Sequence, residues 1–267
     1  MDLPQKANEI RRNIISMIVK AKGGHIGCSL SEVDILTVLF FSTMHFSPVN
    51  QKDPHRDRFV LSKGHASEGL YATLAARGFF PESWLFEYLS HECPLTIHPT
   101  SKVPGVEINT GALGHGLSIG TGMALAAKKT GKKYRTFVLT GDGELQEGSN
   151  WEAAMAAAHY KLGNLTLIID CNGFQLADAI ANTMEINPLM DKLEAFGFDV
   201  HHVDGHDTGA MAGLFDSLDY ASVKPHAVIA RTIKGKGVSF MENRPEWHHT
   251  IPSEEQGEKA LSELSKE

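Results

Sequence analysis

Short apolar runs alternate along this chain with segments in which apolar residues recur at helical spacing. The runs are rich in β-branched and aromatic residues and end at glycine or polar residues, as buried parallel strands do. They lie at residues 58–62, 135–140, 165–169, 199–203 and 226–233. Helical patterns lie at residues 5–21, 31–44, 63–77, 81–89, 123–129, 148–162, 188–196 and 210–220. This alternation predicts an α/β fold whose parallel sheet is flanked by helices on both faces.

We expect one domain over residues 1–267, with residues 253–267 as a charged tail that forms a frayed helix or an interface segment. The central unit is the strand, helix and strand of residues 135–172. A right-handed crossover sets its two strands parallel, so both carboxyl ends lie on one edge of the sheet. Asp142 follows the first strand and Asn172 follows the second. We therefore expect their side chains to meet in a crevice at this edge.

An Asp carboxylate and an Asn amide oxygen suit a hard cation. A site with so few protein ligands suits magnesium, which keeps water and shares phosphate oxygens, so a diphosphate would complete it. Gly141 and Gly143 let the backbone approach such an anion, and amides at the following helix start favour its charge. The plain alternative is a glycine turn with an exposed Asp and an ordinary Asn at a strand end. The Asp and the Asn together favour the metal site.

Composition narrows the class of protein without naming a function. The chain has 267 residues, 21% charged and 42% hydrophobic, as in soluble globular proteins. Its net charge of -7 leaves no basic surface for nucleic acid or an anionic membrane. None of the apolar runs is long enough to span a bilayer, so we expect a cytoplasmic protein. Cys28, Cys93 and Cys171 are odd in number and lack metal-site spacing, which predicts reduced, buried thiols.

Several histidines stand where a ligand could reach them. His25 lies in a glycine-bounded loop, and His98 lies in the middle of the long loop at residues 91–105. His65 stands at a helix start, where it can donate to a phosphate beside free amides. Each has a plain alternative as a surface histidine. The adjacent pair at residues 248–249 has no further ligands nearby in sequence, so zinc is not expected there.

Other motifs carry weaker signals. The glycine-rich segment 110–122 has the wrong spacing for a dinucleotide fingerprint. The segment 234–237, KGKG, lacks the spacing of a phosphate loop and is typical of a flexible basic turn. Glu144 and Glu147 suit solvated acids at a helix start, where the helix dipole favours them.

Several segments in order resemble transketolases: KAKGGHIG, DRFVLSKGHAS, PGVEINTGALGHG, GDGELQEG, HYKLGNLTLIID and MENRPEWHH. GDG followed by a later Asn is similar to the thiamin diphosphate signature. The resemblance covers residues 20–249 and implies a thiamin diphosphate-binding fold. It also implies transfer of a two-carbon ketol group from a ketose phosphate to an aldose phosphate, as in the pentose phosphate pathway. The implied cofactors are thiamin diphosphate and Mg²⁺, for which Ca²⁺ or Mn²⁺ can substitute.

The resemblance also implies roles for particular residues. The implied metal ligands are Asp142, Asn172 and the backbone carbonyl of Phe174. The implied cofactor-binding residues are His65, Gly111, Ala112, Leu113, Gly143, Asn172 and His248. The implied catalytic residues are His25, His98, His248 and Glu147, the last in a carboxylate relay at the subunit interface. For the last histidine, the choice between residues 248 and 249 stays open.

Full-length transketolases continue into a second domain, which binds the aminopyrimidine ring and supplies an activating glutamate. The resemblance therefore implies that this chain works with a separate carboxyl-terminal subunit that supplies this domain, as a heterotetramer, and is inactive alone. The alternatives are the alpha subunit of a 2-oxo acid dehydrogenase, a deoxyxylulose phosphate synthase-like subunit, or a non-catalytic cofactor-binding module. The segments LSKGHAS and PGVEINTGALGHG favour transketolase. The donor and acceptor sugars stay open.

Overall fold

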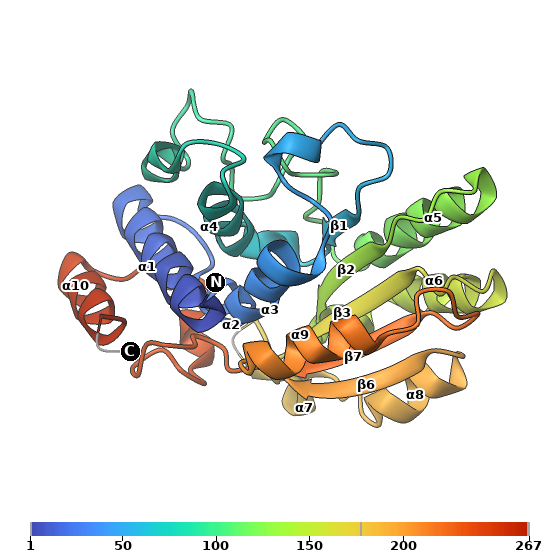
Figure 1. The fold of residues 1–267 in the computed structure, drawn as a ribbon. Helices are drawn as coiled ribbons and strands as arrows, with labels where there is room; N and C mark the ends of the chain where they lie inside the picture. The colour runs from blue at the N-terminus through green and yellow to red at the C-terminus, as the bar shows by residue number, and fades with distance from the viewer. Residues whose placement is uncertain (1, 177, 266–267) are drawn as a thin grey trace.

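A computed structural model describes residues 2–176 and 178–265. Its centre is a five-stranded sheet in the order β1-β2-β3-β7-β6, in which every neighbouring pair is parallel (Figure 1). The strands are β1 (Arg58–Leu61), β2 (Thr136–Gly141), β3 (Leu165–Cys171), β6 (Asp199–Asp204) and β7 (His226–Arg231). The α/β fold expected from the apolar pattern is confirmed, and each expected strand is present to within two residues at its ends.

Helices cover both faces of the sheet because successive strand residues point to opposite faces. On β2, Leu139 belongs to one apolar core and Val138 to the other. The first core is covered by α1 (Leu3–Ala21), α2 (Ile26–Ser31), α3 (Val33–Val38), α4 (Ser67–Arg77) and α9 (Thr208–Ser217). The second is covered by α5 (His115–Thr130), α6 (Gly148–His159) and α8 (Leu189–Ala195). Figure 1 shows the two layers on either side of the strands.

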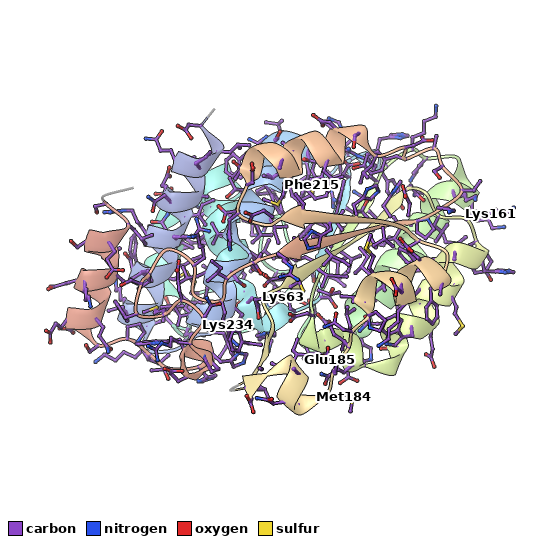
Figure 2. All side chains as sticks on the ribbon, turned by 90° about the horizontal axis from the view of Figure 1, so that it is seen from below. Lys63, Lys161, Met184, Glu185, Phe215 and Lys234 are labelled. Atoms are coloured by element: carbon purple, nitrogen blue, oxygen red, sulfur yellow. The ribbon has the colours of Figure 1, made fainter. Side chains whose placement is uncertain are left out.

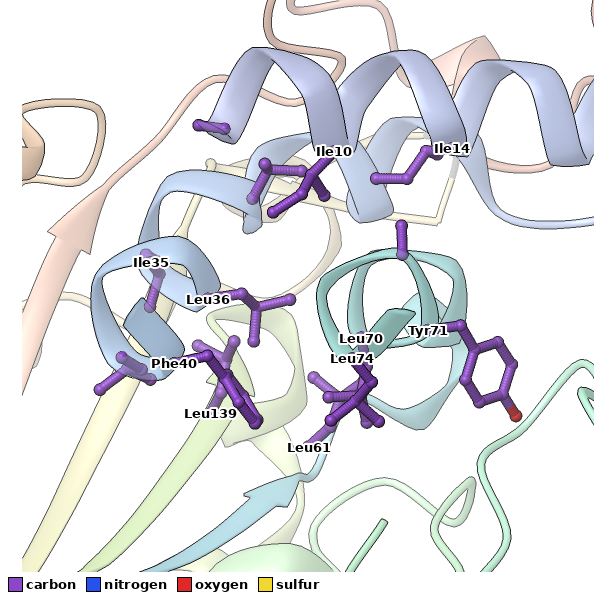
Figure 3. Close-up of a cluster of buried hydrophobic side chains, with 14 of the residues drawn as sticks. Ile10, Ile14, Ile35, Leu36, Phe40, Leu61, Leu70, Tyr71, Leu74 and Leu139 are labelled. Atoms are coloured by element: carbon purple, nitrogen blue, oxygen red, sulfur yellow. The ribbon is translucent and has the colours of Figure 1, made fainter. Parts of the chain in front are cut away.

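The first core packs α1, α3 and α4 against the sheet. Figure 3 shows Ile10 and Ile14 of α1 and Leu36 of α3 around Leu70 of α4, above Leu139 of β2. Each of these side chains is at most 2% exposed. Burial of an aliphatic side chain of this size contributes about 1.5–3 kcal/mol to folding. This packing fixes the strand ends on which the site described below depends.

The helix expected at residues 31–44 is divided and begins earlier. It consists of α2, α3 and a π-helical turn at Leu39–Thr43. Ser31 is the last residue of α2, and its buried hydroxyl donates to the Asp170 carboxylate. The buried stripe already includes Ile26 and Leu30, which is why the helix starts before Ser31. His25, expected in a loop, is the residue that immediately precedes α2.

The helix expected at residues 123–129 begins instead at His115. The glycines in this segment lie within the helix, where they allow it to pack closely against the sheet. A Cβ on Gly116 would lie 2.3 Å from the Ser62 side chain, and one on Gly120 would lie 2.3 Å from Val138. The glycine-rich sequence therefore brings this helix close to the sheet.

Other elements differ in detail. The helix expected at residues 81–89 is the 3-10 helix Glu82–Glu87, and an unexpected hairpin, β4 (Phe174–Gln175) and β5 (Asp178–Ala179), precedes α7 (Ile180–Thr183). The charged tail forms α10 (Glu254–Glu263), which is capped by Ser253 and packs on α1, so within the described residues it is not frayed. Residues 266–267 lie outside the described part.

Two further expectations concern the cysteines and membranes. Cys28 and Cys93 are buried free thiols, and Cys171 is a half-buried one. Across the described residues, none of the helices combines the length and the apolar character that a membrane crossing needs.

Candidate functional site

A cavity of about 280 Å³ opens where the carboxyl ends of β2 and β3 meet the start of α2. This is the edge at which parallel α/β sheets bind ligands. It collects most of the residues that the sequence singles out. Those that line it are His25, His65, Gly111, Leu113, Asp142, Gly143, Asn172, Phe174 and His248.

Asp142 and Asn172 meet through the turn that follows β3. The Asp142 carboxylate accepts hydrogen bonds from the backbone amides of Gly143 at 2.9 Å and Gly173 at 2.6 Å. Asn172 Oδ1 accepts from the Phe174 amide at 3.1 Å. Gly173 has a φ of +80°, which glycine adopts without strain and which lets the turn fold onto Asp142. Both oxygen-bearing side chains thus line one wall of the cavity, as expected.

The environment of Asp142 suits a cation. This side chain is 2% exposed, and burial, with the nearby Asp170 carboxylate, raises the pKa of Asp142 to about 6. A divalent ion beside it would favour the ionised form. Asp142, Asn172 and Phe174 all line the cavity, and carboxylate, amide and carbonyl oxygens are the hard donors that such an ion prefers. The residues present therefore fit magnesium with a phosphate group.

A buried charge network, which the sequence reasoning missed, supports this wall. Lys63 is 1% exposed and forms ion pairs with Asp170 and with Glu32, the latter at 3.2 Å. Asp170 also accepts hydrogen bonds from Ser31 at 2.6 Å, from Thr232, and from the Asn172 amide at 3.4 Å. Burial alone would raise the pKa of Asp170, but the Lys63 ammonium holds it below its usual value. The network thereby orients the Asn172 side chain.

Lys234 is the second functional residue that the sequence reasoning missed. The expected flexible basic turn at residues 234–237 is wrong for this side chain, which is 1% exposed and lines the cavity. Its Nζ donates to the Leu176 carbonyl and to His248 Nδ1, each at 3.1 Å. Burial lowers the pKa of Lys234. Figure 2 shows Lys63 and Lys234 in the same part of the molecule, well away from Lys161. A cation fixed here favours an anionic ligand.

Glu144 is another cavity residue that the sequence reasoning missed. It is 3% exposed and accepts from the Ser62 hydroxyl, from the Gly114 amide at 2.8 Å and from the Gly141 amide at 3.1 Å. The expectation of a solvated acid is therefore wrong for Glu144. Burial raises the pKa of its carboxyl. This side chain ties the start of α5 to the loop that carries Asp142.

Histidines also line the cavity, where their rings form a cluster. The ring of His25 lies 5.4 Å from that of His65, 5.5 Å from that of His248 and 4.6 Å from that of His249. Burial lowers the pKa of His25 to about 4 and that of His248 to about 3, and it lowers the pKa of His65 as well. These three imidazoles are therefore neutral near pH 7. The Lys234 ammonium can only donate, so it fixes His248 with its proton on Nε2.

The remaining predicted residues lie around the cavity rather than in its lining. The His98 ring lies against Gly111, where a Cβ would come within 3.0 Å of it. Ala112 is exposed between two lining residues. Glu147 is exposed and packs against Gly114, outside the lining. The structure thus brings His98 close to the cavity and leaves Glu147 on the surface.

Comparison with known proteins gives a consistent result. Residues 4–263 match the family model described as "Transketolase, thiamine diphosphate binding domain". The chain is 48% identical to an apulose-4-phosphate transketolase subunit from Actinobacillus succinogenes, over 100% of this chain and 97% of that protein. It is 38% identical to the 6-deoxy-6-sulfo-D-fructose transketolase subunit SqwG of a Clostridium species, over 100% and 98% of the two chains.

Solved structures give the same picture. The transketolase of Campylobacter jejuni superposes with a TM-score of 0.91 at 34% identity. The match covers 98% of this chain and 42% of that one, so this chain spans less than half the length of that enzyme.

Proposed function

This chain belongs to the transketolase family, in which it matches the thiamine diphosphate-binding domain, and from this premise we propose that it is the amino-terminal subunit of a split transketolase. It would transfer a two-carbon ketol group from a ketose to an aldose. The observation that carries the proposal is the one cavity that Asp142, Asn172 and Phe174 line together with a cluster of neutral histidines. When bound, thiamin diphosphate would supply the electron sink for breaking the carbon–carbon bond beside a ketose carbonyl.

Magnesium would be held by Asp142, Asn172 and the Phe174 carbonyl, with diphosphate oxygens as its other ligands. Buried carboxylate and neutral amide leave the site with one negative charge, which suits a cation that must also hold an anion. Ca²⁺ or Mn²⁺ would fit the same oxygens. Asp170 and Lys63 would keep Asn172 in place, because both are held by the buried network described above.

The diphosphate would lie between this wall and Lys234. The Lys234 ammonium supplies a positive charge, and His65 and His248 supply ring N–H donors. Gly111, Ala112, Leu113 and Gly143 would approach the cofactor through their backbones. Gly111 has a φ of +147°, so a side chain there would be strained as well as clash with His98.

The histidines would move protons at the substrate. His25 is neutral near pH 7 and lines the cavity, so its ring would accept or donate a proton at a bound hydroxyl. His248 lies 5.5 Å from His25 and His98 lies against Gly111 at the cavity, and both would hold sugar hydroxyl groups. Glu147, exposed beside Gly114, would act at a subunit interface rather than at the sugar.

A partner subunit would complete the enzyme. Two relatives that match over nearly their whole length are named as transketolase subunits. We infer that a separate carboxyl-terminal subunit supplies the pyrimidine-binding domain and an activating glutamate, in a cytoplasmic heterotetramer. Apulose 4-phosphate is the donor to test first, because the relative named for it is more similar than the relative named for the sulfofructose.

The test is ketol transfer with thiamin diphosphate and Mg²⁺, measured for this chain alone and mixed with a carboxyl-terminal subunit. Apulose 4-phosphate, xylulose 5-phosphate and pyruvate should each be tried as donor. We expect transfer from a ketose phosphate in the mixture only. Transfer by the chain alone would contradict the need for a partner, and turnover of pyruvate instead would indicate a different class of thiamin diphosphate enzyme.

A further inference from the structure

A second group of polar side chains lies at the opposite, amino-terminal edge of the sheet. Strands β6 and β7 begin in register, with Asp199 opposite His226. Side chains two residues apart share a face of a strand, so His201 lies on the same side as Asp199. The six residues of β7 separate this edge from the cavity by roughly 17 Å, at about 3.3 Å per residue. The two sites are therefore distinct.

The position of the proton on His226 follows from its surroundings. Its Nε2 lies 3.1 Å from the carbonyl oxygen of Asp219, which can only accept a hydrogen bond. The proton of the neutral ring is therefore on Nε2, and Nδ1 carries a lone pair. The side chain is 1% exposed, and Nδ1 is buried without a hydrogen-bond partner. A buried unpaired nitrogen costs about 1–3 kcal/mol, so a ligand on this atom would stabilise the folded chain.

The lone pair on His226 Nδ1 lies close to two other groups that can bind a metal ion. Its Nδ1 lies 3.4 Å from Asp199 Oδ2, and His201 Nε2 lies 3.1 Å from the same oxygen. Ligand atoms of the three residues all lie within 4.8 Å of one another. Two ligands bound tetrahedrally at about 2.0–2.1 Å are separated by about 3.3 Å. The two separations that involve Asp199, 3.1 and 3.4 Å, therefore match a tetrahedral coordination shell.

We propose that His226 Nδ1, His201 Nε2 and Asp199 Oδ2 bind a zinc-type divalent ion, with water in the remaining position. Two imidazoles and one carboxylate suit zinc and its late first-row neighbours, whereas magnesium prefers oxygen ligands alone. The Asp219 carbonyl would orient His226 in the manner of second ligand spheres around zinc. The side chains of His201 and Asp199 are 27% and 49% exposed, so the ion has a path from solvent.

The consequence is a link across the edge of the sheet. β6 is the edge strand, and its only strand neighbour in the described sheet is β7. An ion that joins Asp199 and His201 to His226 would bind the folded chain and not the unfolded one. Zinc should therefore stabilise the chain by mass action.

A rival explanation is a protonated His226 paired directly with Asp199. That pair would need no metal, and it would be indifferent to added zinc. The test therefore measures metal binding and not only the effect of the residues on stability.

The experiment is a calorimetric titration of the full chain with ZnCl₂ at pH 7.5, after treatment with EDTA and with Mg²⁺ in excess. The unsubstituted chain should bind one equivalent of zinc. His201→Asn and Asp199→Asn should each lower the affinity for that zinc ion at least tenfold. His202→Asn is the matched control, because that side chain lies on the same strand, is exposed and faces the other way. His226→Gln should have the same effect as His201→Asn if it folds.

The pocket histidines form a second place where zinc could bind, so His25→Asn is titrated in parallel. We expect His25→Asn and His202→Asn to bind the zinc ion as the unsubstituted chain does. We expect His201→Asn and Asp199→Asn to lose this binding. Equal binding by all variants, or loss in His25→Asn alone, would overturn the proposal. Failure of the unsubstituted chain to bind zinc would also overturn it.

Discussion

The two edges of the sheet carry the same residue types in different settings. At the carboxyl edge, Asp142 and the histidines are backed by Lys63, Asp170 and Lys234, all at most 1% exposed. At the amino edge, Asp199 and His201 are partly exposed, and only His226 is buried. Buried charges must be paired to be tolerated, and pairing fixes their geometry. The buried ion pairs therefore hold the carboxyl edge in a fixed geometry suited to an anionic cofactor. The exposed side chains of the amino edge are accessible to an ion from solvent.

The sharpest test of this difference removes Asp170. Asp170→Ala leaves the Lys63 ammonium buried without its main partner, which should cost about 3–5 kcal/mol of unfolding free energy. Urea unfolding at neutral pH would measure it. His202→Asn at the amino edge is the control and should change stability by no more than about 0.5 kcal/mol, since the side chain is exposed. Equal, small losses for both variants would contradict a prepared carboxyl edge.

Asp142→Asn should weaken magnesium-dependent binding of thiamin diphosphate by about 100-fold, because it removes the charged ligand while keeping the size of the side chain. Titration of the assembled enzyme by calorimetry would show it. Glu152→Gln, an exposed acid on α6, is the matched control and should bind as the unsubstituted enzyme does. An unchanged affinity of Asp142→Asn for thiamin diphosphate would show that the metal does not bind at this edge.

The histidines should separate by role. His98→Ala should lower kcat about 10- to 100-fold with little change in cofactor affinity, because His98 lies against Gly111 outside the lining. His65→Ala should instead weaken cofactor binding about tenfold and leave kcat at saturating cofactor nearly unchanged. Steady-state kinetics at varied thiamin diphosphate distinguishes them. The reverse pattern would exchange the two roles.

The smallest effect concerns pH. The pKa of Asp142 is raised to about 6, and magnesium binds only the ionised carboxylate. Magnesium affinity should therefore fall as the pH drops below 6, by up to about tenfold per unit, and level off above it. The slope should vanish in Asp142→Asn. A flat profile between pH 5 and 7 in the unsubstituted enzyme would show that Asp142 does not compete with protons for the metal.

Much of the carboxyl edge is predictable because it is local in sequence. Asp142 and Asn172 each directly follow a buried strand, and the parallel crossover alone places them together. His25 immediately precedes α2, and His248 ends the 3-10 helix Pro245–His248 far along the chain, so the prediction that they meet rested on a family resemblance. The fold class followed from the alternation of apolar runs, which the five parallel strands confirm.

The missed residues share one physical cause. Lys63, Lys234 and Glu144 are charged, and a charged residue in a loop or at a helix start is ordinarily solvated. Their burial depends on partners far along the chain, such as Asp170 for Lys63 and Gly114 for Glu144. The early start of α5 was missed for a similar reason, because the buried contact of Gly116 with Ser62 is tertiary. For Lys63, the local sequence offered only its position between the end of β1 and Gly64-His65.

The most direct test of the central claim is a crystal structure of the chain with its partner subunit, thiamin diphosphate and Mn²⁺ in place of Mg²⁺. The account predicts an anomalous manganese peak about 2.1 Å from Asp142, Asn172 and the Phe174 carbonyl, with diphosphate oxygens on its other side. The account would be contradicted if the cofactor were bound with no manganese peak at these residues, or if the manganese peak lay elsewhere.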